Sequence, residues 1–163
     1  MIFLYQTEKG VLHMRFSASW INLFGLGIMF LLMLPNILYM LQNKGLQNKC
    51  RSLTANLLEQ VGRYGCLFLM VFNIGIAEFG FASDTGFLVY MLGNGFCLAL
   101  YLIIWVRYFK TPTFVSAMAL AIAPTVIFLL SGITLRHWLL VGSAVVFGVS
   151  HVYVTYVNAR ENA

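Results

Sequence analysis

Six polar side chains interrupt the apolar stretches of this sequence and are the residues that could bind a ligand. They are Asn36, Asn73, Glu78, Asn94, Tyr101 and His151. His151 is the residue among them whose charge changes near neutral pH, and Glu78 brings a formal charge into an apolar stretch. The amides and the phenol supply hydrogen-bond donors and acceptors. Together these groups could bind a small polar solute, or they could hold helices together by hydrogen bonds.

Signatures of enzymes and metal sites are missing from the sequence. It contains no GxSxG nucleophile motif, no HExxH zinc motif and no glycine-rich phosphate loop. Glu78 and Asp84 could form a carboxylate pair, but only at the outer face, which is a weak basis for catalysis. Cys50, Cys66 and Cys97 lack the spacing of a metal site or a disulfide framework. We therefore predict a protein that is not an enzyme and needs neither metal nor cofactor.

The composition indicates a membrane protein. The 163 residues are 61% hydrophobic and 9% charged, with a net charge of +5. A soluble domain carries about 25% charged residues, so this chain could not cover its surface in water. The basic residues fall at the ends of the apolar stretches, where they contact headgroups and set orientation. The expected partner is the lipid bilayer, and nucleic acid is not an expected partner.

Five apolar stretches are long enough to cross a bilayer as helices. We therefore expect an all-α integral membrane bundle of five transmembrane helices. The expected spans are residues 17–41, 57–81, 86–108, 112–135 and 138–156. They form one membrane domain, 17–158, followed by a short tail, 159–163.

The second expected span begins with polar residues and has one side of small residues. Asn56 and Glu59 have the spacing of a capping box, which predicts that the helix starts there. Glu59 and Arg63 would then form an i,i+4 ion pair at the membrane edge, which we interpret as structural. Gly62 and Cys66, four residues apart, would let another helix approach closely.

The stretch from Leu58 to Gly75, LEQVGRYGCLFLMVFNIG, resembles an uncharacterised family of small bacterial membrane proteins. The resemblance extends from about residue 35 onward. No function is attached to that family, so the resemblance supports the arrangement of spans and nothing more.

The third and fifth spans each have one face defined by residues that recur at steps of three and four. That face is aromatic and polar in the third span, and in the fifth it is small in the outer half and polar toward the end. The third span carries Phe87, Tyr90, Asn94, Cys97, Tyr101, Trp105 and Tyr108. The fifth carries Ala144, Gly148, His151, Thr155 and Asn158. Aromatic hydroxyls interleaved with an amide could line a polar cavity. We expect Asn73 and Asn94 near mid-depth, and Asn36, Tyr101 and His151 in the cytoplasmic half.

Residues 1–16 allow two interpretations. One is a short hairpin that turns at residues 8–10. The other is that Met14 is the biological start, because codons for residues 8–11 can spell a ribosome-binding site about 8 nucleotides upstream of it.

The distribution of basic residues predicts an orientation. If the loop at 42–55 is cytoplasmic, seven basic residues lie inside and three outside. The inside set is Lys44, Lys49, Arg51, Arg63, Arg107, Lys110 and Arg160, and the outside set is Lys9, Arg15 and Arg136. The positive-inside rule then predicts a bacterial cytoplasmic membrane protein with its N-terminus outside and its C-terminus inside.

Two functions of different classes fit the sequence. In the first, a small solute binds in, or passes through, a polar cavity between the second, third and fifth spans, with Glu78 as an outer gate or proton-linked group. In the second, the chain is a non-catalytic accessory, immunity or sensing protein whose polar residues only join helices. We expect a homo-oligomer in either case, because the small-residue faces outnumber the neighbours that five helices offer.

Overall fold

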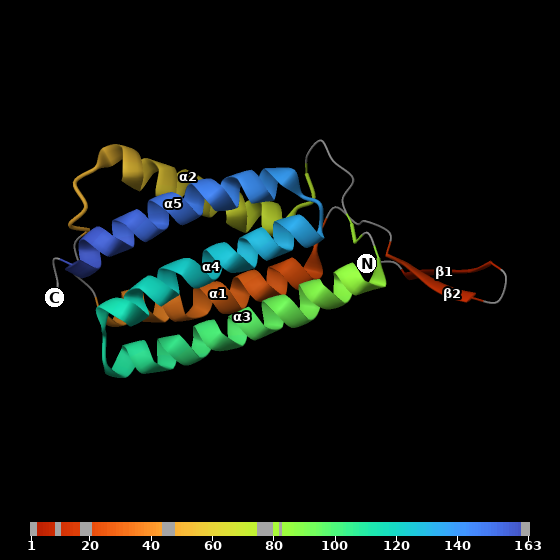
Figure 1. The fold of residues 1–163 in the computed structure, drawn as a ribbon, viewed down its shortest axis with the longest axis horizontal. Helices are drawn as coiled ribbons and strands as arrows, with labels where there is room; N and C mark the ends of the chain where they lie inside the picture. Colours follow the sequence, from red (N-terminus) through yellow and green to blue (C-terminus); the bar gives the residue numbers. More distant parts are fainter. Residues whose placement is uncertain are drawn as a thin grey trace.

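The computed structural model describes residues 3–8, 11–16, 21–43, 48–74, 80–81 and 83–160. Within these ranges five long helices follow a pair of short strands (Figure 1). The helices are α1 (Leu23–Gln42), α2 (Leu53–Val71), α3 (Asp84–Lys110), α4 (Phe114–Thr134) and α5 (Trp138–Arg160). The predicted number of five helices is thereby confirmed, whereas the prediction that all five cross a membrane stays a prediction.

The two strands precede the bundle. β1 (Phe3–Glu8) pairs antiparallel with β2 (Val11–Phe16), and Glu8 lies opposite Val11 at the turn end. Figure 1 shows the pair projecting from the end of the bundle at which α1 begins. This is the pairing that the hairpin interpretation predicts, whereas the start at Met14 stays a prediction.

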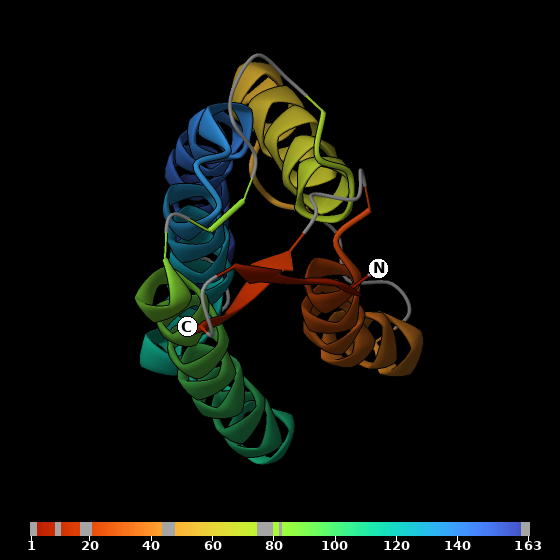
Figure 2. The ribbon, with the colours of Figure 1, turned by 90° about the vertical axis from the view of Figure 1, so that its right-hand side faces the viewer.

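The helices form a closed ring. α1 packs on α2 and α3, α2 packs on α5, α5 packs on α4, and α4 packs on α3. In the end-on view of Figure 2, α1 lies across the bundle from α4 and α5. All five helices contribute apolar side chains to the centre of the ring, among them Leu32, Met70, Tyr101, Ile127 and Leu140. The order around the ring therefore differs from the order along the chain.

α2 and α5 approach each other closely along the ring. A Cβ atom added to Gly62 would lie 2.7 Å from the backbone nitrogen of Phe147. Cys66, one turn further along α2, is fully buried. The prediction that this side of the second helix admits a close neighbour is confirmed, and the neighbour is α5.

Polar side chains cap the start of every helix by accepting a backbone N–H. The capping residues are Asn22, Ser52, Ser83, Thr113 and His137. The predicted helix start at Asn56 is wrong, because the Ser52 hydroxyl accepts from Ala55 and the helix begins at Leu53. The Asn56 amide instead donates to the carbonyl of Cys50, at 2.9 Å.

The second helix also ends earlier than residue 81, the limit that its apolar stretch predicts. It stops at Val71 because backbone groups from the start of α1 take over the hydrogen bonding. The Asn22 N–H donates to the Val71 carbonyl at 2.7 Å, and Ile21 forms an antiparallel bridge with Phe72. Asn73 therefore lies beyond the end of α2, beside the start of α1, and not inside a helix that runs to residue 81.

Four helices of the described chain, α1, α3, α4 and α5, are long and apolar enough to cross a membrane. α2 is not among them, because polar residues occupy much of its first half and lower its hydropathy. The expected number of five membrane-spanning helices is therefore not reached by length and composition. Large apolar side chains are exposed on all five helices, for example Phe30, Val61, Leu92, Val115 and Val149. Such a surface is typical of helices in contact with lipid, so these helices indicate a membrane-embedded protein.

Candidate functional site

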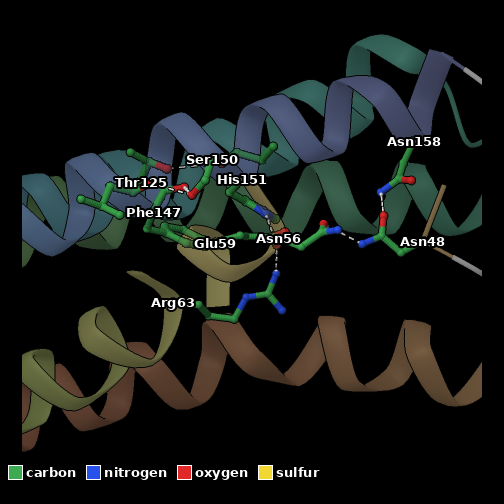
Figure 3. A network of polar contacts seen from close by, with 11 residues as sticks. Asn48, Asn56, Glu59, Arg63, Thr125, Phe147, Ser150, His151 and Asn158 are labelled. Atoms are coloured by element: carbon green, nitrogen blue, oxygen red, sulfur yellow. Dashed lines mark hydrogen bonds and ion pairs between the residues drawn. The ribbon is translucent and has the colours of Figure 1, made fainter. Parts of the chain in front are cut away.

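An ionic cluster joins α2 to α5 inside the ring. The Glu59 carboxylate is 5% exposed and accepts hydrogen bonds from Arg63, one turn further along α2, and from His151 of α5. The distance from His151 Nδ1 to Glu59 Oε1 is 2.9 Å. Figure 3 shows Arg63 and His151 reaching the carboxylate from opposite sides. A buried carboxylate thus has two partners that can balance its charge.

The approach of α2 to α5 positions this cluster. Gly62 against the Phe147 backbone brings the two helices together one turn from Glu59 and one turn from His151. The His151 ring stacks on the Phe147 ring with centroids 4.7 Å apart, which fixes its plane. Because an ionised carboxylate only accepts, His151 Nδ1 carries the shared proton and Nε2 is left for another partner.

A second polar cluster joins α1 to α3. The Asn36 amide donates to the Tyr101 hydroxyl at 2.7 Å and to the Leu32 carbonyl at 2.8 Å. The Tyr101 hydroxyl donates to the same carbonyl at 3.1 Å. Pro35, the preceding residue, has no N–H and weakens this turn of α1, so the side-chain bonds support the helix where its own ladder is incomplete.

Both clusters border one cavity of about 70 Å³ at the centre of the ring. All five helices line it, through Leu32, Met33, Asn36, Arg63, Leu67, Tyr101, Leu120, Pro124, Phe128, Phe147 and His151. Four of these side chains are polar and the rest are apolar. Since a bound water needs about 10–15 Å³ of such volume, the cavity can hold a few waters or a solute of a few non-hydrogen atoms.

The cavity opens between α1 and α2. Tyr101 is only 1% exposed, whereas Asn36 is exposed and the Arg63 side chain is 35% exposed. Three hydrogen-bonding groups at the cavity have no partner among the described residues: the Nε and Nη1 donors of Arg63, His151 Nε2 and the Asn36 carbonyl. The lining is therefore equipped for a ligand that both accepts and donates hydrogen bonds.

Asparagine side chains close the end of the bundle nearest this site. Asn158, near the end of α5, accepts from the Lys49 N–H at 2.8 Å and donates to Asn48 at 3.1 Å. Asn48 in turn donates to Asn56 of α2 at 2.9 Å (Figure 3). These bonds fasten the segment before α2 to α5 and so hold Glu59 opposite His151.

The structure brings together three of the six predicted site residues, because Asn36, Tyr101 and His151 all line the cavity. Asn94 does not line it. Asn94 is fully buried on α3, and neither of its side-chain polar atoms has a hydrogen-bond partner among the described residues. Asn73 lies past the end of α2, and Glu78 lies outside the described residues.

Two residues of the site, Glu59 and Arg63, were interpreted from sequence as a structural pair at the membrane edge. The signal that could have assigned them is the polarity of the helix faces. Glu59 is buried, whereas Leu57, Val61 and Tyr64 on the other faces of α2 are exposed. A membrane helix with this pattern directs its charged residues inward, toward the polar face of the fifth helix.

The described part of the chain contains no group of three or more His, Cys, Asp or Glu side chains that could hold a metal ion. Cys50, Cys66 and Cys97 are free thiols. The site offers hydrogen bonds and charge instead.

The structure thus combines a bundle of apolar helices, typical of a membrane-embedded protein, with a small cavity lined by both polar and apolar side chains. The chain matches no family model, no curated protein and no solved structure.

Proposed function

We propose that this protein binds a small polar solute in the central cavity and passes it across the membrane. The observation that carries the proposal is the convergence of polar side chains from α1, α2, α3 and α5 on one cavity. Polar and charged side chains are costly inside a membrane domain, and where they gather around a cavity they mark a binding site or a pathway. The sequence predicts a cavity between the second, third and fifth spans. The proposed cavity is instead lined by all five helices.

The proposal includes α2 as a fifth transmembrane helix. Its polar residues Glu59 and Arg63 face the interior, and apolar residues such as Leu57 and Phe68 are exposed. An inward polar face and an outward apolar face suit a helix that borders both lipid and a cavity. With five spans, the basic residues near the start of α2 and the C-terminus favour the cytoplasmic side of a bacterial inner membrane for that end.

A second function has an observation of its own in its favour. Several polar groups at the site bond one another between helices, as Asn36 does with Tyr101 and Glu59 with His151. An accessory, immunity or sensing protein would need these bonds only to hold its helices together. This alternative predicts loss of stability on substitution, with no ligand effect to lose.

The two functions are separated by a thermal-shift screen of the detergent-purified protein against metabolites and ions. The screen includes the cavity variants His151→Leu and Asn36→Leu, with Asn94→Leu as a matched control outside the cavity. Solute binding predicts a compound that raises the melting temperature of the wild type and of Asn94→Leu but of neither cavity variant. If no compound shifts the wild type, and the cavity variants are merely less stable, the accessory function is the correct one.

A further inference from the structure

We infer that the solute is a small carboxylate anion, bound by Arg63 and taken up together with one proton that His151 receives. The inference rests on the proposed binding of a solute in the central cavity. It names the chemical class of that solute and the ion that accompanies it.

The charge balance of the cavity carries the first step. The charged and titratable groups around His151 are Glu59 and Arg63 from α2 and Tyr101 from α3, and the lining residues of α1 and α4 add none. With His151 neutral, the Arg63 and Glu59 charges cancel. An anion added to this site would bury an uncompensated charge, which is strongly unfavourable away from water. One proton on His151 restores neutrality.

The geometry of Arg63 carries the second step. Its Nη2 is bound to Glu59, while Nε and Nη1 have no partner among the described residues, and the side chain lies where the cavity opens. The planar guanidinium presents its donors in a fork that matches the two oxygens of a carboxylate. The small volume limits the ligand to an acid of a few non-hydrogen atoms.

The geometry of His151 carries the third step. Nδ1–H is held by Glu59, which does not line the cavity, so Nε2 is the ring nitrogen available to the ligand. A proton from water adds to the lone pair of Nε2, and the new N–H donates to a carboxylate oxygen of the ligand. The Glu59 carboxylate, whose Oε1 lies 2.9 Å from Nδ1, balances the positive charge of the ring once both nitrogens carry a proton.

The test compares acetate with acetamide, its uncharged analogue, by titration calorimetry on the protein in nanodiscs of zwitterionic lipid, where no anionic headgroup competes. Because binding and protonation are reciprocally linked, the Kd of acetate should rise about tenfold per pH unit where free His151 is neutral. Titrations in buffers of different ionisation enthalpy should give about one proton taken up per acetate, a measurement on the wild type that needs no variant.

Variants assign the two roles. His151→Gln should abolish proton uptake and make acetate binding independent of pH, and Arg63→Gln should weaken acetate at least about tenfold, the loss expected for one charge-assisted contact. Asn94→Leu, outside the cavity, should behave as the wild type.

The outcomes distinguish this inference from the proposed function. Acetate binding without proton uptake, or binding of acetamide but not acetate, would overturn the inference and leave solute binding intact. Failure of acetate, acetamide and every compound of the thermal-shift screen would overturn both.

Discussion

Glu59 is the residue on which the interior of the bundle depends most. Its carboxylate is almost fully buried, yet it holds one partner from its own helix and one from α5. Removing one member of a buried ion pair costs about 3–5 kcal/mol, because the remaining charge is left without compensation. Arg63 keeps 35% of its side chain exposed, so part of that cost can be relieved by solvent.

Glu59→Leu should therefore lower the free energy of unfolding by about 2–3 kcal/mol, below the cost for a fully buried pair. Glu59→Gln should cost less, because the amide oxygen can still accept from His151. Chemical unfolding in detergent measures both. In a double-mutant cycle, Glu59→Leu and Arg63→Leu should be less harmful together than the sum of their separate effects. Strict additivity would show that the pair does not interact.

Asn94 presents the opposite case, a buried amide without a partner among the described residues. Leaving a buried polar group unsatisfied costs about 1–3 kcal/mol, and an apolar side chain of similar size removes that cost. Asn94→Leu should therefore raise the melting temperature of the detergent-purified protein. A clear fall would mean that Asn94 bonds buried water whose loss is costly.

At the residue scale, sequence reasoning identified chemistry better than position. His151, Tyr101 and Asn36 were recognisable because each is a polar residue within an apolar stretch. The sequence predicts the pair of Glu59 and Arg63 but not its contact with His151, since the rotation of α2 against α5 depends on Gly62 and on packing that a single sequence does not specify. Asn94 shares a helix face with Tyr101, but only Tyr101 lines the cavity. Which part of that face meets the cavity depends on how the five helices pack, and a single sequence does not specify this packing.

At the scale of elements, the contact between α2 and α5 determines the site. Gly62→Ala would place a methyl group 2.7 Å from the Phe147 backbone, which cannot move aside as a flexible side chain can. We expect a loss of about 1–3 kcal/mol, typical of overpacking.

Gly95 on α3 is the matched control for Gly62→Ala, because nothing lies within 4 Å of its added Cβ. Gly95→Ala should raise the free energy of unfolding by about 0.5–1 kcal/mol, because alanine loses less conformational freedom than glycine in a helix interior. Thermal unfolding of both variants checks the pair, and equal effects at the two positions would contradict the close contact.

The turn between α4 and α5 contains His137, which is fully buried and outside the two helices. Its Nδ1 accepts from the Leu140 N–H at 3.3 Å, and its Nε2 lies 3.4 Å from the Phe72 carbonyl. Burial lowers the pKa of His137 below its ordinary value, against a smaller opposing effect of the bond to Phe72. The folded protein therefore favours the neutral ring.

The unfolded chain consequently binds a proton at His137 that the folded protein does not. The contribution of His137 to stability is full above the ordinary pKa of 6.5 and is lost as the pH falls below it. Melting temperatures measured from pH 8 to pH 5 should decline more steeply for the wild type than for His137→Asn, which keeps a capping oxygen but does not titrate. Parallel curves would contradict this assignment.

The helices themselves were largely predictable, because their apolar lengths and capping residues are local properties of the chain. The end of α2 was not. No proline follows Val71 in its apolar stretch, and the helix stops where its backbone bonds to Ile21 and Asn22, about fifty residues earlier. Contacts of this kind depend on the fold and cannot be read from a local pattern.

At the scale of the molecule, the exposed apolar surface and the clustering of basic residues at one end predict how the chain lies in a membrane. With α2 counted as a span, the positive-inside rule predicts a cytoplasmic C-terminus. A green fluorescent protein fused after residue 163 should fluoresce in bacterial cells, and alkaline phosphatase fused there should be inactive. The reverse pair of results would contradict the orientation. Self-association stays a prediction that crosslinking in membranes can test.

Two prolines give the ring a mechanical property. Pro35 in α1 precedes the cavity residue Asn36, and Pro124 in α4 lines the cavity itself. Each leaves the carbonyl four residues earlier without its helical N–H, so each helix is easiest to bend at that turn. α1 and α4 lie on different sides of the ring, whereas α2 and α5 carry no proline. The bundle therefore combines three helices without proline, α2, α3 and α5, with two helices that bend most easily at the level of the cavity.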